Sequence, residues 1–253
     1  MFEARVTSRI FFSAILFVLA CGGLARADRT HVAIAANFTD AANEIARAFA
    51  AETGHQAVLS FGATGQLYAQ ITQGAPFEVF LSADNVRPAM AVAEGYGVEG
   101  SVFTYATGQL VLYSPDAAVV TGPEVLKEGN FQQIALANPE AAPYGKAAVE
   151  TMQSLGVYEA LQPKMVQGQN IAQTFQFIET GNAELGFVAL GQVARRDGGS
   201  RWVVPQELFT PIRQDAVLLK QGEDNPAATA FIEFLKGDKA AEIIEKYGYA
   251  RAR

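Results

Sequence analysis

Four short turns that carry small residues, hydroxyls and amides are the parts of this chain best suited to bind a ligand. Each follows an apolar run and precedes residues with helical spacing: 37–39 (NFT), 62–65 (GATG), 142–145 (APYG) and 169–171 (QNI). The first N–H groups of a helix have no partner inside the helix, and the helix dipole adds partial positive charge there, so such ends suit an anion. Because the turns contain no Arg or Lys, with only Lys146 nearby, their donors fit a fully ionised tetrahedral oxyanion held by neutral dipoles.

Each of these turns also has a purely structural interpretation. Asn37 and Thr39 are suitable helix caps, and Asn170 is a good N-cap as well. Tyr144 is equally explained as a turn aromatic whose hydroxyl lies in water, and 62–65 as an ordinary tight connection from strand to helix. The prediction of a site therefore depends on the four turns meeting in one place.

Motifs of the common enzyme classes are absent from the sequence. It has no Gly-x-Ser-x-Gly elbow, Walker loop, His-Glu-x-x-His or Cys-x-x-Cys, and its two histidines, His31 and His55, belong to no motif. Tyr247 and Tyr249 resemble the tyrosine-rich ends of iron-binding periplasmic proteins, but they lack an acidic partner and are interpreted as groups that dock the last helix. We therefore predict a protein that is not an enzyme, with no cofactor and no cation site; an exported enzyme on the same fold is the alternative from another class.

The composition is that of a soluble globular protein with an acidic balance. Half of the residues are hydrophobic and 18% are charged, and the formal net charge is −7. A negative chain is an unlikely partner for nucleic acid, which is itself a polyanion. We therefore predict no nucleic-acid partner.

Residues 1–27 have the pattern of a signal peptide. Two arginines precede the apolar stretch 10–20 (IFFSAILFVLA), which is too short to span a bilayer, and 25–27 (ARA) offers a small-x-small cleavage site. Cys21 permits the alternative of a lipoprotein anchor, although Leu19 occupies a position where a smaller residue is usual. We expect a periplasmic protein that begins at Asp28 and contains no cysteine.

Strands and helices are expected to alternate along the rest of the chain. Short apolar runs lie at 31–36, 57–59, 79–82, 134–137, 164–166 and 185–190, and most are followed by helical spacing. We expect a loop over 138–145 and a helix over 146–155. This order predicts an α/β fold whose mostly parallel sheets are covered by helices on both faces.

Two similar apolar strands, 109–113 and 216–219, indicate two crossings between α/β lobes. The predicted first lobe comprises 28–109 together with 216–253, and the second comprises 110–215. A ligand would then lie in the cleft between the lobes, near the ends of strands and the N-termini of helices.

Six segments spread over nearly the whole mature chain follow the pattern of one family: 32–39 (VAIAANFT), 60–64 (SFGAT), 74–84 (GAPFEVFLSAD), 138–140 (NPE), 185–188 (LGFV) and 236–242 (KGDKAAE). From about Thr30 to Tyr249 the chain resembles the periplasmic molybdate-binding proteins of ABC transporters. The resemblance implies the type II periplasmic-binding-protein fold, with two lobes joined by two crossover strands. It also implies capture of molybdate and tungstate in the cleft, delivery to a permease in the inner membrane, and a monomer.

In that family, neutral donors of both lobes hold the oxyanion. Matched position by position, the ligand-binding residues here are Asn37, Thr64, Tyr144 and, through its backbone, Ile171. Many members carry Ser at the position of Asn37, a small residue at that of Tyr144, and Tyr at that of Ala189. The Tyr144 hydroxyl could therefore substitute for one that other members supply from a different turn.

The departures leave the choice of oxyanion open. Sulfate or phosphate is the alternative ligand within the class of binding proteins. Protonated phosphate needs a hydrogen-bond acceptor, and the matched positions contain no acidic residue to provide one.

Overall fold

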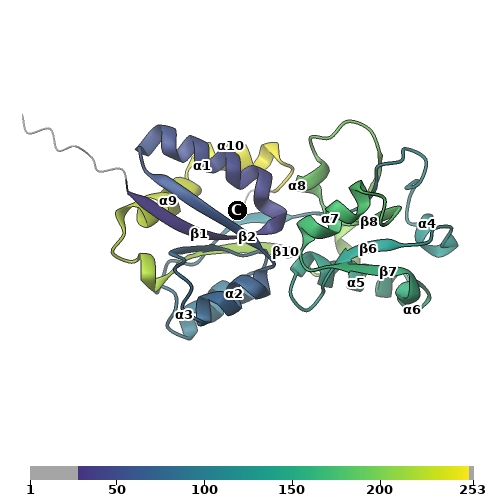
Figure 1. The fold of residues 1–253 in the computed structure, drawn as a ribbon, viewed down its shortest axis with the longest axis horizontal. Coiled ribbons are helices and arrows are strands. Elements are labelled where there is room, and N and C mark those ends of the chain that lie inside the picture. The colour runs from purple at the N-terminus through teal and green to yellow at the C-terminus, as the bar shows by residue number, and fades with distance from the viewer. Residues whose placement is uncertain (1–27, 251–253) are drawn as a thin grey trace, which may run out of the picture.

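Two five-stranded sheets form two lobes in the part of the chain that the computed structural model describes, residues 28–250 (Figure 1). The strand order is β2-β1-β3-β10-β4 in the first sheet and β7-β6-β8-β5-β9 in the second. Both sheets are mixed, and helices flank both, so the predicted two-lobed α/β fold is confirmed. The predicted signal peptide, including Cys21, lies outside the described residues.

The first sheet combines three parallel strands with an antiparallel pair. β1 (Arg29–Ala35) lies between β2 (Gln56–Gly62) and β3 (Val79–Leu81) and is parallel to both. β10 (Ile212–Leu218) runs antiparallel to β3 and to β4 (Phe103–Gly108). The carboxyl ends of β1 and β2 therefore meet at one edge of the sheet, where ligands of α/β proteins commonly bind.

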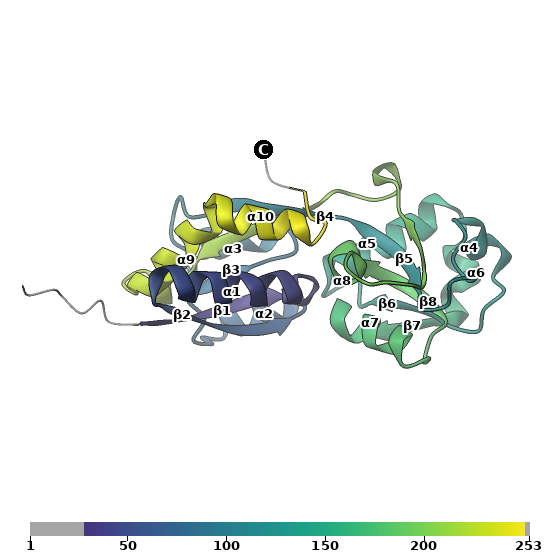
Figure 2. The ribbon, with the colours of Figure 1, turned by 90° about the horizontal axis from the view of Figure 1, so that it is seen from above.

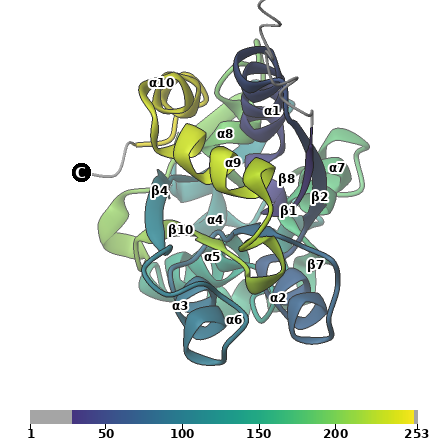
Figure 3. The ribbon, with the colours of Figure 1, turned by 90° about the vertical axis from the view of Figure 1, so that its left-hand side faces the viewer.

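Helices cover both faces of this sheet, because its buried strands are apolar on both sides. α1 (Thr39–Thr53), α9 (Pro226–Lys236) and α10 (Asp238–Lys246) share one core with Val32 and Ile34 of β1. On the other face, α2 (Thr64–Thr72) and α3 (Val86–Ala93) pack around Ala33. Figure 3 shows the two helix layers above and below the sheet.

The second sheet has the same kind of arrangement. Its strands are β5 (Leu110–Ser114), β6 (Ile134–Ala137), β7 (Met165–Gly168), β8 (Leu185–Ala189) and β9 (Ser200–Val203). β6 is parallel to β7 and β8, whereas β5 is antiparallel to β8 and β9. The helices around it are α4 (Glu124–Glu128), α5 (Pro143–Ser154), α6 (Tyr158–Leu161), α7 (Ile171–Glu179) and α8 (Leu190–Val193).

Several 3₁₀ turns complete the secondary structure: η1 (Ala36–Phe38), η2 (Gln162–Lys164), η3 (Gln206–Leu208) and η4 (Lys220–Gly222). The turn η1 matters most for function, because it connects β1 directly to α1 at the edge that faces the second lobe. Among the helices of residues 28–250, none is long and apolar enough to cross a membrane.

The chain passes twice between the lobes. The first passage is Gln109, which separates β4 from β5, and the second is 204–211, between β9 and β10 (Figure 2). Residues 212–215, which the sequence analysis grouped with the second lobe, pair with β4 in the first sheet. The register of this pairing shifts between Gln214 and Asp215, so β10 carries an irregularity close to the passage.

The structure differs from the sequence-based prediction at the strand β4 and at the start of α5. β4 was not predicted, although Tyr105 and Ala106 are buried within it. The expected loop 138–145 is shorter than predicted, because α5 begins at Pro143 rather than at residue 146. Proline is favoured at the first position of a helix, where its missing N–H costs no hydrogen bond, so Tyr144 lies in the first turn of α5.

Candidate functional site

A small cavity of about 10 Å³, enough for roughly one water molecule, lies where the lobes meet. All of the residues around it are apolar or neutral: Ala35, Ala36, Asn37, Gly62, Ala63, Thr64, Ala83, Ala142, Pro143, Tyr144 and Ile171. The structure therefore brings together Asn37, Thr64, Tyr144 and Ile171, the four residues that the sequence analysis selected. No carboxylate, imidazole, amine or guanidinium is among these lining residues.

Helix N-termini from both lobes converge on the cavity. In the first lobe, η1 and α2 follow the carboxyl ends of β1 and β2, while in the second, α5 and α7 follow β6 and β7. Each of the helices α2, α5 and α7 begins within one residue of a lining residue. Their first N–H groups and dipoles make this a region of partial positive charge without any cationic side chain.

Thr64 is the first residue of α2 and is 1% exposed. Its Oγ1 accepts a hydrogen bond of 3.0 Å from the backbone N–H of Ala83. A hydroxyl has one proton to donate as well as two acceptor sites, so this bond fixes the oxygen and leaves the proton for another partner.

Ile171 contributes the start of α7. Asn170 caps this helix, as predicted, because its Oδ1 accepts from the backbone N–H groups of Ala172 and Gln173 at 3.0 Å each. The Ile171 carbonyl accepts from Gln192 Nε2 at 3.1 Å. With the two following N–H groups occupied by the cap, the Ile171 N–H is the donor of this turn best placed to serve a ligand.

Tyr144 is buried in the first turn of α5, with 1% of its surface exposed. The helix start lies close to β6, since a Cβ on Gly145 would come within 2.1 Å of the Ala137 carbonyl oxygen. Gln214 Nε2 donates to the Tyr144 hydroxyl oxygen at 3.4 Å across the lobe boundary. Burial raises the pKa of Tyr144 well above its ordinary value, so the hydroxyl keeps its proton and remains a donor.

Asn37 lies in η1 and is 4% exposed. Its Nδ2 donates to Gln214 Oε1 at 2.9 Å and to the Tyr249 hydroxyl at 3.2 Å, which uses both amide protons. The interpretation of Asn37 or Thr39 as the cap of α1 is wrong, because α1 has no side-chain cap and Thr39 Oγ1 instead donates to the Ala36 carbonyl.

A buried polar cluster that the sequence did not indicate lies behind Asn37 and Tyr144. It consists of Tyr105, Gln214 and Tyr249. Tyr249 also donates to the Asn37 carbonyl at 2.6 Å. The predicted docking role of the C-terminal tyrosines is thus confirmed for Tyr249, and its place next to Asn37 is a finding that the sequence did not indicate.

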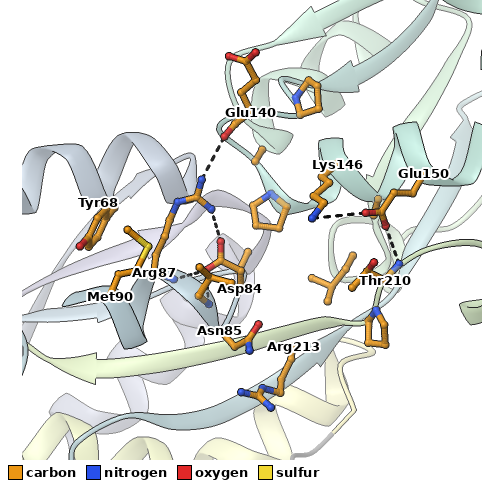
Figure 4. A pocket seen from close by; sticks show the side chains of 18 residues that line it. Tyr68, Asp84, Asn85, Arg87, Met90, Glu140, Lys146, Glu150, Thr210 and Arg213 are labelled. Atoms are coloured by element: carbon orange, nitrogen blue, oxygen red, sulfur yellow. Dashed lines mark hydrogen bonds and ion pairs between the residues drawn. The ribbon is translucent and has the colours of Figure 1, made fainter. Parts of the chain in front are cut away.

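A larger pocket of about 410 Å³ adjoins the cavity and contains the charged residues of this region (Figure 4). Arg87 forms an ion pair with Asp84 and donates from Nη2 to the Glu140 carbonyl of the other lobe at 3.3 Å. Lys146, whose side chain is 67% exposed, lies 3.7 Å from Glu150. These charges line the larger pocket and not the cavity. Nowhere in residues 28–250 do three or more His, Cys, Asp or Glu lie together as a metal site would require.

Comparison with known proteins shows the family to which the chain belongs. The family described as bacterial extracellular solute-binding protein matches residues 30–250. The chain is 53% identical over 243 residues to "Molybdate-binding protein ModA" of Rhodobacter capsulatus, covering 96% of each chain. It is 51% identical over 246 residues to the protein of the same name from Azotobacter vinelandii, covering 96% of this chain and 97% of that one.

The fold is also similar to a solved structure, the Azotobacter vinelandii periplasmic molybdate-binding protein. The TM-score is 0.86 at 38% identity, and the alignment covers 88% of this chain and 100% of the Azotobacter vinelandii chain. Since the relatives are matched over their whole length, the likeness includes both lobes and the region between them.

Proposed function

This chain belongs to the family of bacterial extracellular solute-binding proteins, and on that premise we propose that it captures molybdate, and tungstate with it, for an ABC transporter permease. The observation that carries the proposal is the cavity between the lobes, which is lined by neutral groups and faced by the N-termini of helices. Its relatives are binding proteins, and this chain acts as one rather than as an enzyme.

The donors at the cavity suit a fully ionised oxyanion. The proposed set is the Thr64 hydroxyl, the Tyr144 hydroxyl and the backbone N–H groups of Asn37 and Ile171. The Asn37 side chain is left out because both of its amide protons are donated within the first lobe. Each bond to a charged oxygen is worth about 1.5–3 kcal/mol, so a few such donors are enough for tight binding without a cation.

Lobe motion gives the ligand access. In the described structure the lobes touch, since the Gly65 N–H donates to the Ala141 carbonyl at 2.9 Å. A cavity with room for about one water molecule accepts an oxyanion when the lobes separate, and the anion then bridges donors of both lobes as they close.

The remaining parts of the proposal concern the cell and the partners. We place the mature protein in the periplasm after removal of residues 1–27, as a monomer with no cofactor and no nucleic-acid partner. The family match supports only the proposed cleavage site, because it begins at residue 30, shortly after that site.

Calorimetric titration with molybdate, tungstate, sulfate and phosphate in parallel tests the proposal. We expect molybdate and tungstate to bind tightly and alike, because they share charge and shape, and sulfate to bind more weakly because it is smaller. Phosphate should bind weakest, because its protonated form needs an acceptor and no carboxylate lines the cavity. Failure to bind molybdate, or tighter binding of phosphate, would overturn the assignment.

A further inference from the structure

Gln214 connects the two halves of the cavity wall without lining the cavity itself. It lies on β10 at the register shift, close to the second passage between the lobes, and is completely buried, with 0% of its surface exposed. A buried amide must satisfy its hydrogen bonds inside the protein, because an unpaired one costs about 1–3 kcal/mol. Where these bonds go therefore shows what the residue does.

The partners of Gln214 determine which way its amide points. Oε1 accepts from Asn37 Nδ2 at 2.9 Å. The Tyr105 hydroxyl lies 3.1 Å from Oε1 and 3.0 Å from the Ser82 carbonyl oxygen, and its one proton is shared between them. A flipped amide would place its own N–H groups against the amide protons of Asn37, so the observed orientation is the one that the network favours. Nε2 is thereby directed at the Tyr144 oxygen, 3.4 Å away.

This direction limits the partners of the Tyr144 hydroxyl. An amide nitrogen only donates, so Tyr144 receives a hydrogen bond from Gln214 and cannot return its own proton to it. The proton is left for a partner on another side of the oxygen, where the side chains of Asn37 and Tyr249 also interact with the hydroxyl. Since Tyr144 lines the cavity, an oxyanion there is the acceptor that this arrangement fits.

The contact between Gln214 and Tyr144 lies directly over Gly108, the last residue of β4. A Cβ at position 108 would approach the Tyr144 hydroxyl to 2.1 Å and Gln214 Nε2 to 2.8 Å. Any side chain at Gly108 would therefore displace one of the two groups. The contact thus occupies a closely fitted space beside Gln109, where the chain first passes between the lobes.

We infer that Gln214 is a positioning residue, which orients the Tyr144 hydroxyl as a hydrogen-bond donor to the oxyanion and joins the Asn37 side of the site to the Tyr144 side. This inference rests on the proposed function. Gln214 does not line the cavity, so its effect on affinity passes through the residues that it bonds, and the orientation of its amide assigns the main effect to Tyr144.

A double-mutant cycle with molybdate tests this dependence. Gln214→Met keeps the size and removes the amide, and Tyr144→Phe removes the hydroxyl; each should weaken binding roughly 10- to 150-fold, the range expected for a hydrogen bond to a charged group. The double mutant should bind no more weakly than Tyr144→Phe alone, because without the hydroxyl there is nothing left to orient. Effects that multiply would overturn the inference.

Two further variants separate orientation from structural support. Gln214→Glu has the same shape, but its carboxylate accepts a hydrogen bond from the Tyr144 hydroxyl, which turns that donor away from the oxyanion. The carboxylate also adds negative charge near the cavity. Gln214→Glu should therefore weaken binding more than Gln214→Met. Tyr105→Phe removes a bond to Gln214 Oε1 while the bond from Asn37 remains, and should weaken binding less than Gln214→Met. The reverse order for either variant would contradict an orienting role.

Thermal unfolding of each variant shows whether it is folded, and Gln214→Leu, which is also neutral, replaces Gln214→Met in the cycle if the latter does not fold. The unaltered protein separates the two hypotheses. If it does not bind molybdate, the proposed function fails and the inference fails with it. If it binds and the cycle is additive, the inference alone fails.

Discussion

Thr64 shows most directly how a single side chain can serve both the fold and the ligand. Its oxygen is held by the Ala83 N–H at 3.0 Å, which leaves the hydroxyl proton available at the cavity. Thr64→Val keeps the shape and removes this donor, so we expect calorimetry to show molybdate affinity falling roughly 10- to 150-fold, as for one bond of about 1.5–3 kcal/mol to a charged oxygen. Thr64→Ser retains the hydroxyl and is the control, with most of the affinity preserved. Normal binding by the Val variant would remove Thr64 from the proposed ligand set.

A site residue could be predicted from the sequence only where the residues next to it form a recognisable pattern. Thr64 and Ile171 are visible because each stands where an apolar run ends and helical spacing begins. Gln214 has no such signal, since it sits in a polar stretch and finds its partners 177 residues away at Asn37 and 70 residues away at Tyr144. Its burial is a product of tertiary packing, which spacing along the chain does not reveal.

At the scale of elements, the cap of α7 links helix stability to the site. Asn170 takes the N–H groups of Ala172 and Gln173, which leaves the first N–H of the helix for the ligand. Asn170→Ala should lower the free energy of unfolding by about 0.5–2 kcal/mol, the usual cost of losing an N-cap. It should also weaken molybdate binding, because without the cap the first turn of α7 frays and the Ile171 N–H is no longer held in place at the cavity.

A second N-cap provides the matched control for that prediction. Asn225 caps α9 in the first lobe by accepting from the Ala227 N–H at 2.9 Å, and it is not among the residues that line the cavity. Asn225→Ala should therefore destabilise the protein without changing molybdate affinity. Chemical denaturation and calorimetry on both variants measure the two effects, and an equal loss of affinity in both would show that the cap of α7 has no special relation to the site.

The elements themselves could be predicted where one pattern dominates. The alternation of apolar runs with helical segments identified most of the strands of both sheets and the helices that follow them. β4 was missed because Phe103–Gly108 mixes threonines with buried aromatic and small residues, and the start of β10 was missed because Arg213, Gln214 and Asp215 are polar although two of them are buried. Both strands lie beside a passage between the lobes, where the requirements of the site compete with a plain apolar pattern.

For the whole molecule, the lobes meet at two places. At one of them α8 lies against η1 and α1, and Arg195 donates to the Tyr247 hydroxyl at 3.3 Å. The other is a single turn. Three elements of the first lobe reach the stretch 138–144 of the second: Gly65 of α2 bonds to the Ala141 carbonyl, Arg87 of α3 to the Glu140 carbonyl, and Gln214 of β10 to Tyr144. Because this stretch leads into α5, closure and the position of the Tyr144 hydroxyl are controlled together. The relative position of the lobes follows from these distant contacts and could not be predicted from local patterns.

Arg87 allows this arrangement to be tested, because it makes its bond to the Glu140 carbonyl only when the lobes are together. Arg87→Met should speed the release of molybdate, measured by exchange against excess tungstate, while the rate of binding changes little. The bond is partly exposed and worth about 0.5–1.5 kcal/mol, so release should accelerate roughly 2- to 12-fold.

Arg213→Met is the control, since Arg213 lines the same pocket but pairs with Asp215 within the first lobe. In small-angle scattering, the Arg87 variant without ligand should have a larger radius of gyration than the unaltered protein. Equal release rates for both variants would mean that Arg87 does not hold the closed state.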